Sequence, residues 1–152
     1  MIMISACLCG ENCKYDGGNN LNAELKELFD KGKAVTVCPE VMGGLSTPRS
    51  PSEIMADGRV VMKDGTDVTE NFKKGALLSL KTAQKVKPTV VILKAKSPSC
   101  GVGKIYDGTF SKTLKCGNGI CADMLIKNGF NVITENDDIQ KYIKQENDNE
   151  LD

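Results

Sequence analysis

The 152-residue chain lacks histidine and tryptophan altogether, and aromatic residues make up only 5% of it. Because no imidazole is present, cysteines that gather in this chain form an all-thiolate site, which suits soft metals. The scarcity of aromatic rings argues against a stacking platform for single-stranded nucleic acid. The 20 basic and 20 acidic side chains cancel to a net charge of zero, without a long basic stripe. Electrostatic capture of nucleic acid therefore has little support.

Long apolar runs are also missing. No stretch approaches the roughly 18 consecutive apolar residues that a membrane-spanning helix needs, so no membrane partner is expected. The apolar opening at residues 1–8 is short and has no positively charged segment before it. We therefore predict a core strand there rather than a signal peptide.

The chain length suits one domain. Strand-like apolar segments alternate with segments of helical periodicity, which predicts an α/β fold: a Rossmann-like three-layer sandwich with a mostly parallel central sheet. Strands are expected at 1–7, 34–37, 89–93 and 131–134, and helices at 21–30, 70–86, 119–128 and 138–145. Residues 38–51 are expected to form a loop, and 59–68 a small hairpin around an Asp-Gly turn. The domain is predicted to span 1–145, and 146–152 to be an acidic, disordered tail.

Seven cysteines without any sign of secretion indicate a reducing, cytoplasmic location, where disulfides seldom persist. Cys7, Cys38 and Cys100 each stand just after a predicted strand. In a parallel sheet these strand ends lie side by side, at the edge where open α/β sheets bind ligands. Three converging thiolates without histidine favour an iron–sulfur cluster with one iron left open. The plainer interpretation is that free cysteines are small buried hydrophobes.

Zinc is the competing metal. Cys9 and Cys13 have the spacing of a zinc-binding pair, and Cys38 with Cys100 could supply the second pair. Zinc sites more often take both pairs from local spacings, which these last two cysteines do not have.

Other polar residues near the predicted strand ends could carry chemistry. Glu40 follows Cys38 by two residues and is a candidate for proton transfer. Ser97 could hydrogen-bond a substrate or merely begin a turn. Cys116 and Cys121 are expected to be partly buried, inert thiols.

Several short motifs together resemble one known family. They are Ser5-Ala-Cys-Leu8, Lys14-Tyr-Asp-Gly-Gly18, Val37-Cys-Pro-Glu-Val41, Gly43-Gly-Leu45, Pro48-Arg49, Asp67-Val-Thr69, Ser97-Pro-Ser-Cys-Gly101 and Tyr106-Asp-Gly-Thr-Phe110. Over residues 1–135 the chain resembles the short, single-domain members of the DUF523 family, whose longer relatives include thiouracil desulfurases of the TudS type.

This resemblance implies a 4Fe–4S cluster held by Cys7, Cys38 and Cys100. The implied reaction removes sulfur, as sulfide, from a thiolated pyrimidine or nucleoside. The open iron would polarise the thiocarbonyl group, a water activated by Glu40 would attack the ring carbon, and Ser97 would orient or protonate the substrate. The expected substrate-binding residues are Asp16, Gly17, Gly44 and Ser99.

The chain departs from the family pattern at Cys9 and Cys13, where aliphatic residues are common. Either thiol could add a fourth ligand and close the open iron. Two alternatives to a desulfurase therefore stay open: a non-catalytic sulfur carrier and a structural zinc protein. The sequence leaves the oligomeric state and the exact substrate undecided.

Overall fold

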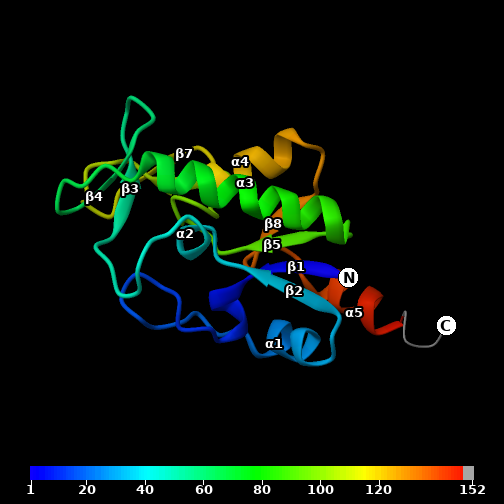
Figure 1. Ribbon diagram of the computed structural model, residues 1–152. Coiled ribbons are helices and arrows are strands. Elements are labelled where there is room, and N and C mark those ends of the chain that lie inside the picture. Colours follow the sequence, from blue (N-terminus) through cyan, green and yellow to red (C-terminus); the bar gives the residue numbers. More distant parts are fainter. Residues whose placement is uncertain (149–152) are drawn as a thin grey trace.

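The computed structural model describes residues 1–148 and is built on a four-stranded parallel sheet in the order β2-β1-β5-β8 (Figure 1). The strands are β1 (Ile2–Ser5), β2 (Ala34–Val37), β5 (Val91–Leu93) and β8 (Val132–Thr134). In β1 every residue is buried, as is every residue of β5. Strands covered on both faces read as continuous apolar runs, which is why composition alone located them.

Helices cover both faces of the sheet, so the predicted three-layer α/β sandwich is confirmed (Figure 1). One face packs on α1 (Ala23–Asp30) and α5 (Gln140–Asp148), and the other on α3 (Thr69–Val86) and α4 (Ile120–Lys127). Alternate residues of β1 supply the two cores: Ile4 joins the first and Met3 the second. Within residues 1–148, none of the helices has both the length and the apolar character to cross a membrane.

The predicted tail is wrong for residues 146–148, which belong to α5. Glu146 is only 4% exposed, and its carboxylate accepts hydrogen bonds of 2.8 and 2.9 Å from the Met1 ammonium group. Thr89 donates a further hydrogen bond of 3.2 Å to the same carboxylate. The acidic composition could not reveal these partners, because they lie far away in sequence. Residues 149–152 of the predicted tail lie outside the described residues.

Short elements interrupt the predicted loops. A helix, α2 (Pro39–Met42), begins directly after β2, so the loop prediction for 38–51 is wrong at its start. The predicted hairpin at 59–68 keeps its first strand, but its second strand is reduced to one bridge between Val61 and Asp67. The additional elements are η1 (Ala6–Cys9), the antiparallel pair β3 (Ser52–Ile54) and β4 (Val60–Met62), and the antiparallel pair β6 (Lys104–Tyr106) and β7 (Leu114–Cys116).

Helix α2 touches α3 backbone to backbone. A Cβ atom added at Gly75 would lie 1.8 Å from the carbonyl oxygen of Pro39, and one at Gly43 would lie 2.0 Å from that of Asn71. The Asn71 side chain also donates a 2.9 Å hydrogen bond to the Gly43 carbonyl. Only glycine permits this close approach of the two helices. The contact fixes the position of α2 and of the Glu40 side chain that α2 carries.

We predict that Gly75→Ala destabilises the protein. In an ordinary helix interior this change stabilises by about 1 kcal/mol. Here the added methyl group would overlap Pro39, and such overpacking typically costs about 1–3 kcal/mol. Chemical denaturation of Gly75→Ala measures the change, with Lys74→Ala on the exposed face of α3 as the control. A higher denaturation midpoint in Gly75→Ala would contradict the close packing.

Candidate functional site

A cavity of about 550 Å³ opens at the carboxyl edge of the sheet, where β1, β2 and β5 end. The three predicted cysteines, Cys7, Cys38 and Cys100, all line it. A fourth cysteine, Cys13, lines the same cavity. The structure therefore brings together the three cysteines that were grouped from the strand ends, and it adds Cys13, which was not in that group.

Each of the three cysteines is placed by the segment that follows its strand. Cys7 lies in η1 directly after β1, and the Asn20 amide donates a 3.4 Å hydrogen bond to its sulfur. Cys38 occupies the N-cap position of α2, with Pro39 as the first helical residue, a position that suits proline because its nitrogen needs no hydrogen bond there. Cys100 lies in a tight loop, where its backbone nitrogen donates to the Ser97 hydroxyl at 3.1 Å.

Helix α4 holds the loop that carries Cys100. The Ile120 nitrogen donates to the Pro98 carbonyl, and the Cys121 nitrogen to the Ser99 carbonyl, both at 2.9 Å. A helix leaves its first N–H groups without intrahelical partners, so here the loop supplies those partners. The loop is therefore fixed by hydrogen bonds from a rigid element rather than by its own composition.

The four thiols differ in their tendency to ionise. A hydrogen bond from Cys13 lowers the pKa of Cys7 to about 7, and the same kind of bond lowers the pKa of Cys38. The Cys13 thiol lies within hydrogen-bonding reach of both sulfurs and can give its single proton to one of them at a time, which raises its own pKa. Burial raises the pKa of the Cys100 thiol. Because metal ligation requires thiolates, Cys7 and Cys38 are the two most readily available ligands.

The donor set fits an iron–sulfur cluster better than one zinc ion. Cys9 turns away from the cavity into the core and donates to the Leu25 carbonyl at 3.8 Å, so the predicted zinc pair of Cys9 and Cys13 is split. Within residues 1–148, no three cysteine, aspartate or glutamate side chains stand close enough to share one metal ion. A four-iron cluster binds each cysteine to a different iron and so takes a more widely spaced set of thiolates.

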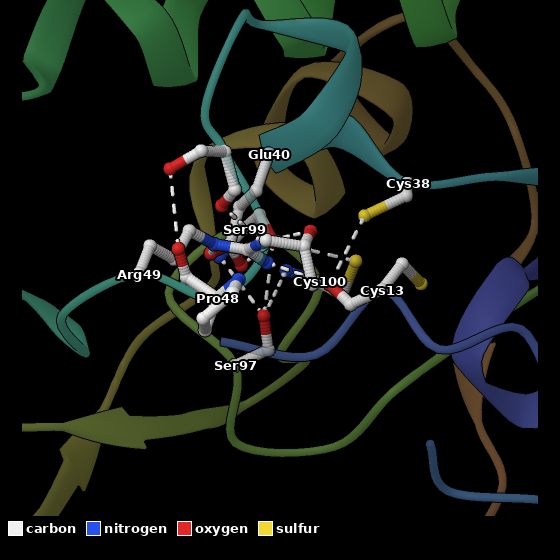
Figure 2. A network of polar contacts seen from close by, with 10 residues as sticks. Cys13, Cys38, Glu40, Pro48, Arg49, Ser97, Ser99 and Cys100 are labelled. Carbon is white, nitrogen blue, oxygen red and sulfur yellow. Dashed lines mark hydrogen bonds and ion pairs between the residues drawn. The ribbon is translucent and has the colours of Figure 1, made fainter. Parts of the chain in front are cut away.

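Glu40 lies beside these thiols and is held at both carboxylate oxygens (Figure 2). Arg49 Nε donates to Oε1 at 3.1 Å, and the Ser99 hydroxyl donates to Oε2 at 3.0 Å. The hydroxyl groups of Ser97 and Ser99 lie 3.0 Å apart. A chain of polar contacts thus runs from Arg49 to Ser97, and Ser99 rather than Ser97 contacts the carboxylate.

Arg49 is a site residue for which sequence reasoning assigned no role, although it belongs to the Pro48-Arg49 motif. Its side chain is only 4% exposed. Besides Glu40, it donates to the Cys13 carbonyl at 2.8 Å, the Ser46 carbonyl at 3.1 Å and the Thr47 hydroxyl at 3.0 Å. A buried cation needs such complete pairing, and this one ties together the loops on either side of the cavity.

The predicted substrate-binding residues differ in whether they line the cavity. Ser99 lines the cavity, whereas Asp16, Gly17 and Gly44 are not among its described lining residues. Asp16 is exposed and accepts a 2.9 Å hydrogen bond from the Gly18 nitrogen, as expected for a turn. Their role in substrate binding stays a prediction without support from this geometry. Other polar and aromatic residues line the cavity instead, among them Lys14, Tyr15, Lys63, Lys96, Tyr106 and Lys112.

Comparison with known proteins assigns the chain to a family. The profile of the 2-thiouracil desulfurase family matches residues 2–137. The chain belongs to this family. It is 42% identical over 146 residues to the uncharacterized protein YbbK of Bacillus subtilis (strain 168), an alignment that covers 90% of this chain and 97% of YbbK. The family resemblance predicted from the motifs is thereby confirmed.

A solved structure shares the family fold. It is that of the 4Fe–4S-dependent thiouracil desulfidase TudS (DUF523Vcz), which matches with a TM-score of 0.85 at 38% sequence identity. The match covers 95% of each chain. The likeness therefore extends over the sheet, the covering helices and the segments that line the cavity.

We predict that Cys7→Ala, Cys38→Ala and Cys100→Ala each lose most of the cluster that anaerobic reconstitution assembles. Removing one of three thiolates leaves part of the iron core without a protein ligand. Cys116→Ala should keep its iron, because Cys116 is exposed and does not line the cavity. Iron and sulfide per chain are the measurement. Normal iron content in any of the first three variants would remove that cysteine from the ligand set.

Proposed function

We propose that this protein is a 4Fe–4S-dependent desulfidase that replaces the sulfur of a thiolated pyrimidine with oxygen from water and releases sulfide. The observation that carries the proposal is a carboxylate, Glu40, anchored beside Cys38 and Cys100 in one cavity. Membership in the 2-thiouracil desulfurase family and the likeness to TudS support it.

Cys7, Cys38 and Cys100 would hold the cluster. When bound, it would supply a Lewis-acidic iron that withdraws electrons from a thiocarbonyl group. The overall change is hydrolytic: a C=S group and water give a C=O group and hydrogen sulfide, so no electron donor is consumed. The work left to the protein is to bind the pyrimidine and to move protons.

Glu40 is the group that takes a proton from the attacking water. Arg49 and Ser99 fix its two oxygens, which keeps the carboxylate in one orientation. The Ser99 hydroxyl lies 3.0 Å from Glu40 Oε2 and 3.5 Å from the Cys100 sulfur, so it stands between the carboxylate and a proposed cluster ligand and can pass a proton from Glu40 toward the cluster site. Ser97 accepts hydrogen bonds from the Ser99 and Cys100 nitrogens and so orients this loop. The predicted catalytic role of Ser97 is thus proposed to act through Ser99.

The substrate class follows from the cavity wall. Tyr106 and Phe110 offer rings that suit a planar pyrimidine, and Lys63, Lys96 and Lys112 line the same space. These cations favour a substrate that bears an acceptor or anionic group besides the ring. Both a thiolated nucleoside and the free base carry such acceptor groups.

The assay uses anaerobically reconstituted protein with thiouracil and with thiouridine as separate substrates. We expect loss of the thiocarbonyl absorbance, with one sulfide released per pyrimidine and no added reductant. A sulfur carrier would bind sulfide without turnover of either substrate. A colourless protein with stoichiometric zinc would identify the structural alternative and overturn the proposal.

We predict that Glu40→Gln keeps its cluster but loses about a hundredfold or more in turnover, the usual scale for a positioned acid–base group. Glutamine retains the size and the hydrogen-bonding shape but cannot take a proton from water. Glu11→Gln, at an exposed site, is the matched control. Turnover is compared at equal iron content. Undiminished activity would show that another group activates the water, and loss of iron would make Glu40 a support for Cys38.

A further inference from the structure

Cys13 stands inside the thiol cluster of the cavity and has no part in the mechanism above. It is only 6% exposed, and its thiol lies within hydrogen-bonding reach of the sulfurs of Cys7 and Cys38. The Cys38 sulfur also lies 4.0 Å from the Cys13 carbonyl oxygen. The sulfurs of Cys13, Cys38 and Cys100 appear in Figure 2 beside the Glu40 network. The cavity therefore contains four thiols, not three.

The backbone around Cys13 is fixed on both sides. Its nitrogen donates to the Glu11 carbonyl at 2.9 Å, and its carbonyl accepts the 2.8 Å hydrogen bond from Arg49. The Arg49 backbone nitrogen also donates to the Tyr15 carbonyl at 2.7 Å. The same buried guanidinium thus anchors both the Glu40 carboxylate and the segment that aims the Cys13 thiol.

The other cysteines of the chain are directed elsewhere. Cys9 packs in the core under α1, and its burial raises its pKa to about 11. Cys121, a residue of α4, is fully buried in the core, and Cys116 is exposed on β7. From the sequence alone, Cys9 and Cys13 are equal candidates for a fourth thiolate. The structure brings only Cys13 into the cavity with Cys7, Cys38 and Cys100.

We propose that Cys13 is a labile fourth ligand, bound to the fourth iron while the site is free of substrate and displaced by the sulfur of the substrate. A set of four cysteine thiolates is the usual complement of a 4Fe–4S cluster. This inference rests on the proposed function for the identity of the cluster.

The exchange balances without a redox step. The bond from Cys13 sulfur to iron breaks and a bond from the thiocarbonyl sulfur forms. The released Cys13 sulfur would stay in the cavity, within reach of Cys7 and Cys38. When sulfide departs, Cys13 would bind the iron again. Its return would assist product release and protect the iron between turnovers.

Iron-57 Mössbauer spectroscopy of the reconstituted protein tests the ligand directly. Wild type and the control Cys9→Ala should show four sulfur-coordinated irons, whereas Cys13→Ala should show one iron in four with a distinct isomer shift. Cyanide serves as a probe of the open iron and should bind Cys13→Ala at least about tenfold more tightly than wild type, a difference of about 1.4 kcal/mol.

A distinct iron already present in wild type, with equal cyanide affinity in Cys13→Ala, would overturn the ligand role. Loss of iron from Cys13→Ala and Cys9→Ala alike would also overturn it, because a weakened fold would explain both. Loss from Cys13→Ala alone, with iron retained in Cys13→Ser, would support it. Spectra as expected without turnover of any thiolated pyrimidine would refute the proposed function and leave the ligand role standing.

Discussion

The buried ion pair between Arg49 and Glu40 is the constraint on which the site depends. Neither charge can be left alone at this depth, because removing one partner of a buried pair typically costs about 3–5 kcal/mol. The guanidinium satisfies that demand with contacts to three segments: α2 through Glu40, the N-terminal loop through the Cys13 carbonyl, and its own loop through Ser46 and Thr47. The walls of the cavity are held to one another by the same charge that orients the Glu40 carboxylate.

Elements whose buried residues form a recognisable pattern within a short stretch of sequence could be predicted. Elements that are buried only through contacts with distant parts of the chain could not. The central strands are apolar on both faces and could be recognised from composition. Helix α2 has only four residues and exists because Gly75 lets it approach α3, which no periodicity reveals. Strands β6 and β7 lie in a glycine-rich, largely exposed region, where their pairing with each other is the only signal.

The same distinction applies to the site. Parallel strands bring their carboxyl ends together, so Cys7, Cys38 and Cys100 could be grouped before any coordinates were known. The direction of a side chain within a turn cannot be deduced in this way. Cys9 ends the η1 turn and faces α1, while Cys13, four positions later, returns to the cavity.

The proposed cluster ligands and the proposed acid–base groups alternate along the same short segments. Cys38 and Glu40 begin α2, and Ser99 precedes Cys100 in the loop that α4 holds. A shift of either segment must therefore move a thiolate and a proton-transfer group together. In the proposed reaction, this coupling would keep the distance between the cluster and Glu40 constant. Hydrolysis of a C–S bond needs this, because the activated carbon and the attacking water must meet. It also explains why a rigid helix start and a helix-capped loop, rather than flexible loops, carry these residues.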